Sequence, residues 1–125
     1  MLNKTGIYFK RRMHSFQYAI NGLKEFISSE HHARIHILLM LAAIAFGLLL
    51  KINNTEWLML IVVISMVFIS EMINTSIEKI CNYIQPEIHP DIMIIKDISA
   101  GAVMIASLVA LIIGCIIFLP IIICR

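Results

Sequence analysis

Three long runs without charge restrict the folds open to this chain. Residues 37–50 are all apolar (one glycine included), 57–69 is interrupted only by Ser65, and 98–124 contains no charged residue. Of the 125 residues, 60% are hydrophobic, more than a soluble domain of this size can shield from water. A bilayer core about 30 Å thick needs roughly 20 apolar helical residues, which the third run supplies alone and the others with their flanks. The sequence therefore predicts an all-α integral membrane fold with three transmembrane helices.

The positive charges predict an orientation for these helices. Eight basic residues fall before the first run or between the second and third runs: Lys4, Lys10, Arg11, Arg12, Lys24, Arg34, Lys79 and Lys96. Two fall between the first and second runs or after the third: Lys51 and Arg125. Cytosolic loops carry the excess of lysine and arginine, so we expect the N-terminus and the second connection in the cytosol, where ATP is present. Charges every few positions in the first 34 residues leave no apolar segment typical of a signal peptide.

The N-terminal segment predicts an amphipathic helix over 7–29. Its apolar residues recur at alternating steps of four and three: Phe9, Met13, Phe16, Ile20, Leu23 and Ile27. We expect this helix to lie in the membrane interface, although packing on the helical bundle remains an alternative. Together with membrane helices over 32–51, 57–83 and 92–119, it is expected to form a single domain over 1–125.

A polar face at the end of the second span is the strongest candidate site. Glu71, Asn74 and Glu78 fall within about 60° of one another on a helix. Glu71 lies about 21 Å along the helix from Trp57, close to the cytosolic headgroups, and Glu78 about 10 Å further out. A carboxylate at the centre of a membrane helix costs roughly 2.5–3.5 kcal/mol, so Glu71 is interpreted as functional. Glu78 taken alone fits a solvated exit from the membrane equally well.

Other charged residues are expected at the same cytosolic level. Glu30 precedes the first span, and Lys96 and Asp97 begin the third. Mg²⁺ typically takes one or two carboxylates plus phosphate oxygens, and lysine acts as a point charge on phosphate. These residues therefore suit a divalent cation and a phosphate chain, and the remaining carboxylate could accept a proton from an alcohol.

Several common sites are absent from the sequence. No glycine pattern matches a P-loop or a kinase glycine loop. His32 and His36 are four residues apart but lack a third ligand at a suitable spacing, which favours interfacial histidines over a metal site. The three cysteines show neither paired nor metal-ligand spacing, and we assign no role to Cys81, Cys115 and Cys124.

A series of short motifs covers nearly the whole chain. They are Arg11…Tyr18…Gly22-Leu23, Glu30 with Ala33-Arg34-Ile35-His36, Glu56-Trp57, E-x-x-N-[ST]-x-x-E at 71–78, Glu87-x-His89 and Lys96-Asp97-x-x-[SA]-[AG]. In this combination and at these spacings the chain resembles the small bacterial integral-membrane lipid kinases, the diacylglycerol kinase and undecaprenol kinase family.

The resemblance implies a homotrimer in the bacterial cytoplasmic (inner) membrane, with active sites shared between neighbouring subunits and no nucleic-acid partner. It implies that Glu71 is the general base toward a lipid hydroxyl and that Glu30 and Glu78 hold Mg²⁺ with ATP. The same resemblance assigns nucleotide contacts to Arg11, Tyr18, Asn74, Glu87, His89, Lys96 and Asp97. The implied products are undecaprenyl phosphate or phosphatidic acid.

The chain departs from the family pattern in two places. Asn82 stands where an acid is usual, and Ile94-Ile95 stand where small or polar residues are commoner. The residues 34–36 and the Glu56-Trp57 pair look more like the undecaprenol-kinase branch than the enterobacterial diacylglycerol-kinase branch.

Two other classes of protein compete with a kinase. A small proton- or cation-coupled transporter would explain a membrane glutamate such as Glu71, but not the clustering of Glu30, Glu78, Lys96 and Asp97. A purely structural membrane subunit would leave Glu71 unexplained.

Overall fold

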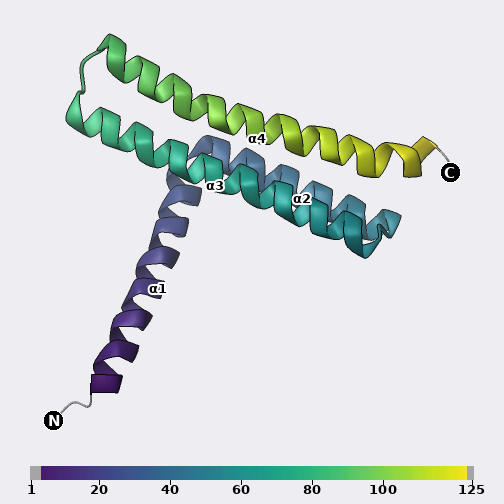
Figure 1. The fold of residues 1–125 in the computed structure, drawn as a ribbon, viewed down its shortest axis with the longest axis horizontal. Coiled ribbons are helices and arrows are strands. Elements are labelled where there is room, and N and C mark those ends of the chain that lie inside the picture. Colours follow the sequence, from purple (N-terminus) through teal and green to yellow (C-terminus); the bar gives the residue numbers. More distant parts are fainter. Residues whose placement is uncertain (1–3, 124–125) are drawn as a thin grey trace. The chain divides into compact units, whose positions relative to one another are not determined.

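The structure is a computed structural model that describes the backbone of residues 4–123 and the side chains of residues 12–123. The described chain is all-helical, as predicted, with helices α1 (Lys4–Ser29), α2 (His31–Leu50), α3 (Asn54–Ile84) and α4 (Pro90–Ile123) (Figure 1). It divides into two compact units, one containing α1 and the other beginning at His32.

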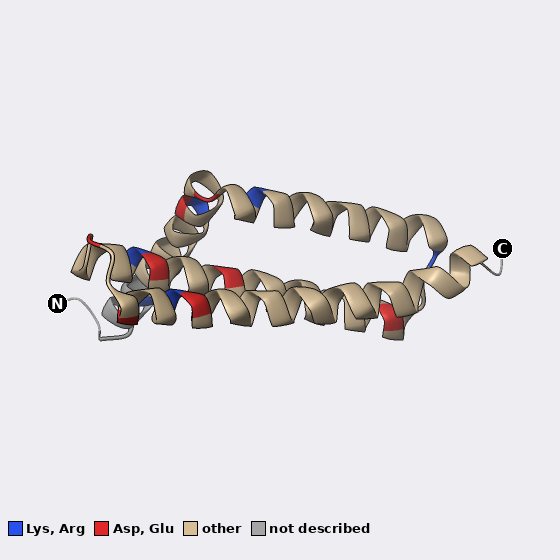
Figure 2. Ribbon diagram, turned by 90° about the horizontal axis from the view of Figure 1, so that it is seen from above, with Lys and Arg blue, Asp and Glu red and all other residues tan. Residues whose placement is uncertain are grey.

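Three of the helices are long and apolar enough to cross a membrane, in agreement with the sequence prediction. They contain 20, 31 and 34 residues, and at 1.5 Å per residue they measure about 30, 46 and 51 Å. Because a bilayer core is about 30 Å thick, α3 and α4 are longer than a crossing requires. Figure 2 shows long uncharged stretches along these helices, with most of the charged residues toward one end of the bundle and a few further inside.

The connection between α2 and α3 is a tight turn with well-defined caps. Lys51 ends α2 with a positive φ of 53°, the left-handed conformation common after a helix C-terminus. Asn53 then caps α3, because its Oδ1 accepts hydrogen bonds from the backbone N–H groups of Thr55 and Glu56 at 2.9 and 3.0 Å. Glu56 Oε2 accepts in return from the Asn53 N–H at 2.7 Å, which completes a capping box. The sequence predicted that this helix starts at Trp57. Because of these caps, α3 begins three residues earlier, at Asn54.

The apolar core lies at this turn. Ile52, Leu60 and Ile117 are buried together, and Trp57 packs against them. Gly47 permits the close approach of α2, since a Cβ atom there would lie 2.8 Å from the Trp57 ring. Phe46 of α2 and Phe118 of α4 also face each other, with ring centroids 6.2 Å apart. The apolar core that the three helices share thus lies at the end far from the predicted site.

α4 packs along α3 and is longer than the sequence indicated. It begins at Pro90, where the missing N–H costs no helical hydrogen bond. It also continues through Pro120 to Ile123, whereas the sequence suggested an end near 119. The proline removes one helical hydrogen bond, and the last turn of α4 packs against the apolar core through Ile121.

Candidate active site

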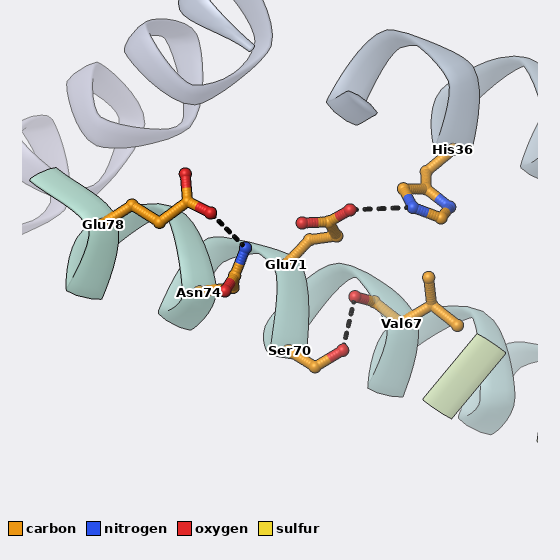
Figure 3. Close-up of polar contacts among 6 residues, drawn as sticks. All are labelled: His36, Val67, Ser70, Glu71, Asn74 and Glu78. Atoms are coloured by element: carbon orange, nitrogen blue, oxygen red, sulfur yellow. Dashed lines mark hydrogen bonds and ion pairs between the residues drawn. The ribbon is translucent and has the colours of Figure 1, made fainter. Parts of the chain in front are cut away.

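Glu71 and Ser99 are the two buried polar side chains among the described residues, each 7% exposed. Glu71 lies on α3, and its Oε1 is 2.9 Å from Nε2 of His36 on α2 (Figure 3). A buried carboxylate needs a hydrogen-bonding or charged partner to offset the loss of water. For Glu71 this partner is the imidazole of His36 on the neighbouring helix. The sequence had identified Glu71 from its depth but had treated His36 as an interfacial histidine.

A second set of contacts joins α3 to α4. The Ser99 hydroxyl lies 2.6 Å from Asn74 Oδ1 and 2.9 Å from the backbone oxygen of Lys96. Asn74 in turn donates from Nδ2 to Glu78 Oε1, at 3.4 Å. The two carboxylates of this face, Glu71 and Glu78, therefore have different partners, and the amide of Asn74 lies between them (Figure 3).

Lys96 also reaches α3 with its side chain. Its Nζ donates to Oδ1 of Asn82 at 2.8 Å. Asn82 is the position where the sequence departs from the family pattern, and a neutral amide oxygen here takes the place of a carboxylate partner. The lysine is thus held beside α3 without a counter-charge from this residue.

An apolar groove runs along the membrane part of α2, α3 and α4. Its volume is about 570 Å³, and the described residues that line it are apolar except for His36, Ser107 and Cys115. On α3 the lining extends from Leu60 to Phe68, which is about 12 Å at 1.5 Å per residue. His36 belongs both to this lining and to the hydrogen bond with Glu71, so the groove adjoins the buried carboxylate.

The other predicted site residues take no part in these hydrogen bonds. Glu87, His89 and Asp97 are exposed, and His89 Nδ1 accepts a hydrogen bond from the Asp91 backbone N–H at 3.3 Å. Glu30 and Tyr18 lie in the unit that contains α1, where Tyr18 is 72% exposed and Glu30 Oε1 accepts from the Ser29 hydroxyl at 3.5 Å. Arg11 is in α1, but its side chain is outside the described residues. In the part of the chain described here, no three histidine, cysteine or acidic side chains are clustered as metal ligands.

His36 could have been found from the register of the hairpin. The turn between α2 and α3 is centred on Ile52, which is 16 residues after His36 and 19 before Glu71. In an antiparallel pair these separations place both residues at similar depth, about 24 and 28 Å from the turn. Ser99 had a weaker indication, because a small residue at a helix interface is as common in packing as in hydrogen bonding.

Comparison with known proteins gives the family. The sequence profile described as prokaryotic diacylglycerol kinase matches residues 17–118. The chain is 32% identical over 118 residues to the undecaprenol kinase of Bacillus subtilis, covering 94% of this chain and 93% of that protein. It is 31% identical to the diacylglycerol kinase of Synechocystis sp. over 85% of this chain and 61% of that protein. It is 32% identical to the diacylglycerol kinase of Helicobacter pylori, over 78% of this chain and 76% of that protein.

The family profile covers α3 with its polar face and most of α4, so Glu71, Asn74, Glu78 and Ser99 fall inside the matched region. The profile agrees with the resemblance that the motifs had indicated, and the three helices long and apolar enough to cross a membrane fit a membrane kinase. The chain belongs to the prokaryotic diacylglycerol kinase family and is an enzyme, a lipid kinase.

Proposed function

We propose that this membrane-bound lipid kinase transfers the γ-phosphate of ATP to the hydroxyl group of a membrane lipid alcohol in a Mg²⁺-dependent reaction. The acceptor is undecaprenol or diacylglycerol, and the product is undecaprenyl phosphate or phosphatidic acid. The observation that carries the proposal is the position of Glu71, a buried carboxylate next to an apolar groove and on the same helix face as Asn74 and Glu78.

Glu71 is the general base in this proposal. Its carboxylate takes the proton of the lipid hydroxyl while the oxygen attacks the γ-phosphorus, and the bond from that phosphorus to ADP breaks. General-base catalysis of this kind contributes about 10²- to 10⁴-fold to the rate. The groove supports a lipid acceptor, since its lining is almost entirely apolar and His36 joins it to the base.

Glu78 and Glu30 are proposed to hold Mg²⁺ together with the phosphates of ATP. Their carboxylate oxygens fit the ion, which usually binds proteins through one or two carboxylates and takes further oxygens from phosphate. Bound there, Mg²⁺ would neutralise charge on the transferred phosphate. Glu78 is half-buried and already accepts a hydrogen bond from Asn74, which restricts its rotamers.

The remaining polar residues are proposed to contact the nucleotide. Lys96 supplies a positive charge for phosphate, and its bond to Asn82 holds the ammonium group beside α3. The other proposed contacts come from Arg11, Tyr18, Asn74, Glu87, His89 and Asp97.

The proposed assembly is a homotrimer in the bacterial cytoplasmic membrane, with N-terminus and active sites on the cytosolic side. In it, residues 1–125 act as one domain, α1 lies in the membrane interface, and neighbouring subunits share active sites. Large apolar side chains of α2 support contacts with lipid or with other subunits, because Leu48 and Leu49 are 65% and 73% exposed. Lysine and arginine are in excess in α1, at the start of α2, near the end of α3 (Lys79) and near the start of α4 (Lys96), and this excess supports the orientation.

Of the two acceptors, undecaprenol is the one we propose as preferred. The match to the undecaprenol kinase of Bacillus subtilis extends over 94% of this chain, against 85% and 78% for the two diacylglycerol kinases. The motifs at 34–36 and Glu56-Trp57 point to the same branch.

A direct assay tests the function. Purified protein in mixed micelles receives labelled ATP, Mg²⁺ and either undecaprenol or diacylglycerol, and the lipid phase is analysed for label. We expect label in both lipids, with a higher kcat/KM for undecaprenol. Folded protein that labels neither lipid would remove the proposed reaction, and a higher kcat/KM for diacylglycerol would remove the proposed preference.

A further inference from the structure

His36 is placed to control the orientation of the Glu71 carboxylate. Its Nε2 atom lies 2.9 Å from Glu71 Oε1, a good hydrogen-bond distance, and the two side chains are 19% and 9% exposed. The hydrogen bond is therefore largely shielded from water, which would otherwise compete with it. Among the described residues, no other side chain or backbone group forms a hydrogen bond with this carboxylate.

The role of Glu71 determines which partner donates. A general base must be ionised before it accepts a proton, and an ionised carboxylate only accepts hydrogen bonds. The hydrogen of this contact therefore belongs to His36 Nε2, which fixes the imidazole as the Nε2–H tautomer or as the imidazolium. In both forms His36 donates to Oε1 of Glu71, so this oxygen is occupied by the hydrogen bond.

The second oxygen of Glu71 is then the one available for the substrate. No described residue donates to Oε2, and no side-chain oxygen or nitrogen in the described part is both fully buried and without a partner. Oε2 consequently remains accessible from outside the protein. Figure 3 shows it turned away from His36, on the side of Asn74 and Glu78.

We propose that His36 is a positioning residue, which holds Oε1 so that Oε2 faces the lipid hydroxyl and the phosphate to be transferred. The inference rests on the proposed function and adds a residue to that site. Rotation about the terminal bond of a glutamate side chain is only weakly restricted, so a carboxylate without this partner would sample orientations in which neither oxygen meets the hydroxyl. The arrangement of base and orienting group is the one that activates nucleophiles in other enzymes.

A purely structural role is the alternative. The same hydrogen bond joins α2 to α3 at the end of the bundle far from the apolar core, so its loss could simply loosen the helices. The two roles differ in what they change. Loosening would alter stability and the binding of both substrates, whereas misplacing the base would lower kcat and leave binding intact.

The test compares His36→Leu with His36→Gln in the micelle assay. Leucine removes the donor, whereas the glutamine amide can still donate to Oε1. We expect kcat of the leucine variant to fall about 100-fold, the effect of a displacement near 1 Å in an active site, with both KM values within about threefold of wild type. The glutamine variant should recover most of this loss. The matched control is His32→Leu, one turn earlier on α2 and exposed, which should keep wild-type kcat.

Three kinetic results would overturn the positioning role. They are wild-type kcat in His36→Leu, a rise in KM without loss of kcat, and a glutamine variant as slow as the leucine variant. Thermal unfolding in the same detergent shows whether each variant is folded. An inactive wild-type protein would instead remove the proposed function itself.

A measurement without turnover examines the pair directly. Protein labelled with ¹⁵N in histidine reports the ring nitrogens of His36 by NMR, identified through their loss in His36→Gln. We expect the proton on Nε2 in wild type, and a shift of that signal in Glu71→Leu, which removes the acceptor. Identical His36 signals in wild type and Glu71→Leu would show that the pair does not form, whatever the activity of the enzyme.

Discussion

Ser99 of α4 and Asn74 of α3 are joined by a 2.6 Å contact from the serine hydroxyl to Oδ1 of the asparagine. Because Asn74 Nδ2 in turn donates to Glu78, this contact sets the orientation of the amide, with its oxygen toward α4 and its nitrogen toward the carboxylate. A buried serine on one helix thus influences a proposed Mg²⁺ ligand on another.

Ser99→Ala should therefore weaken nucleotide binding as well as stability. Asn74 Oδ1 would lose its donor, at a cost of about 1 kcal/mol, and the amide could rotate away from Glu78. We expect the KM for MgATP to rise about fivefold and kcat to change less. The control is Ser76→Ala, an exposed serine whose hydroxyl bonds to the Met72 carbonyl of its own helix at 2.8 Å. A loss of thermal stability in Ser99→Ala at unchanged KM would show that Asn74 does not act on the nucleotide.

Glu71→Gln should stop turnover without preventing ATP binding. The amide keeps the size of the side chain and an oxygen for His36, but it cannot take a proton from an alcohol. We expect kcat to fall about 10²- to 10⁴-fold, while the Kd for ATP measured by calorimetry stays near the wild-type value. Glu56→Gln makes the same chemical change in the turn at the opposite end of the bundle and should preserve kcat. An equal loss of ATP binding in Glu71→Gln would exclude the base role.

Glu78→Gln should change the dependence on Mg²⁺. Replacing the carboxylate removes a charged oxygen ligand, and a loss of about 1.4 kcal/mol corresponds to a tenfold weaker interaction. We expect the half-saturating Mg²⁺ concentration at saturating ATP to rise about tenfold, with activity partly restored by excess Mg²⁺. A Mg²⁺ curve that coincides with that of wild type would assign Glu78 to another role.

Much of the fold could be predicted from the sequence because the bilayer acts on runs of residues. The three uncharged runs correspond to α2, α3 and α4, and the depth of Glu71 along its run was enough to identify it as unusual. Helical periodicity also places Glu71, Asn74 and Glu78 on one face without further information.

The partners of that face were harder to predict. Periodicity fixes which residues share a face, but the rotation of each helix about its axis is set by packing between helices. His36 therefore had an ordinary interpretation, an interfacial histidine, and Ser99 was not singled out, until the structure brought them to Glu71 and Asn74 respectively. Asn82 was recognised as a departure from the family, but its bond to Lys96 depends on the position of α4 beside α3.

The separation between the apolar core and the polar site predicts that stability and catalysis can be altered independently. Gly47→Ala would place a Cβ atom 2.8 Å from the Trp57 ring and 3.1 Å from Ile52. Overpacking of this kind costs typically about 1–3 kcal/mol, so the thermal unfolding midpoint in detergent should fall.

The control is Gly101→Ala in α4, where an added Cβ meets nothing within 4 Å and alanine favours the helix by about 0.5–1 kcal/mol. Because Gly47 lies near the turn and Glu71 is about 28 Å from it along α3, kcat per folded molecule should be unchanged in Gly47→Ala at a temperature where both proteins are folded. A fall in kcat under these conditions would mean that packing at the turn is transmitted along α2 to His36, and that the two ends of the bundle are coupled.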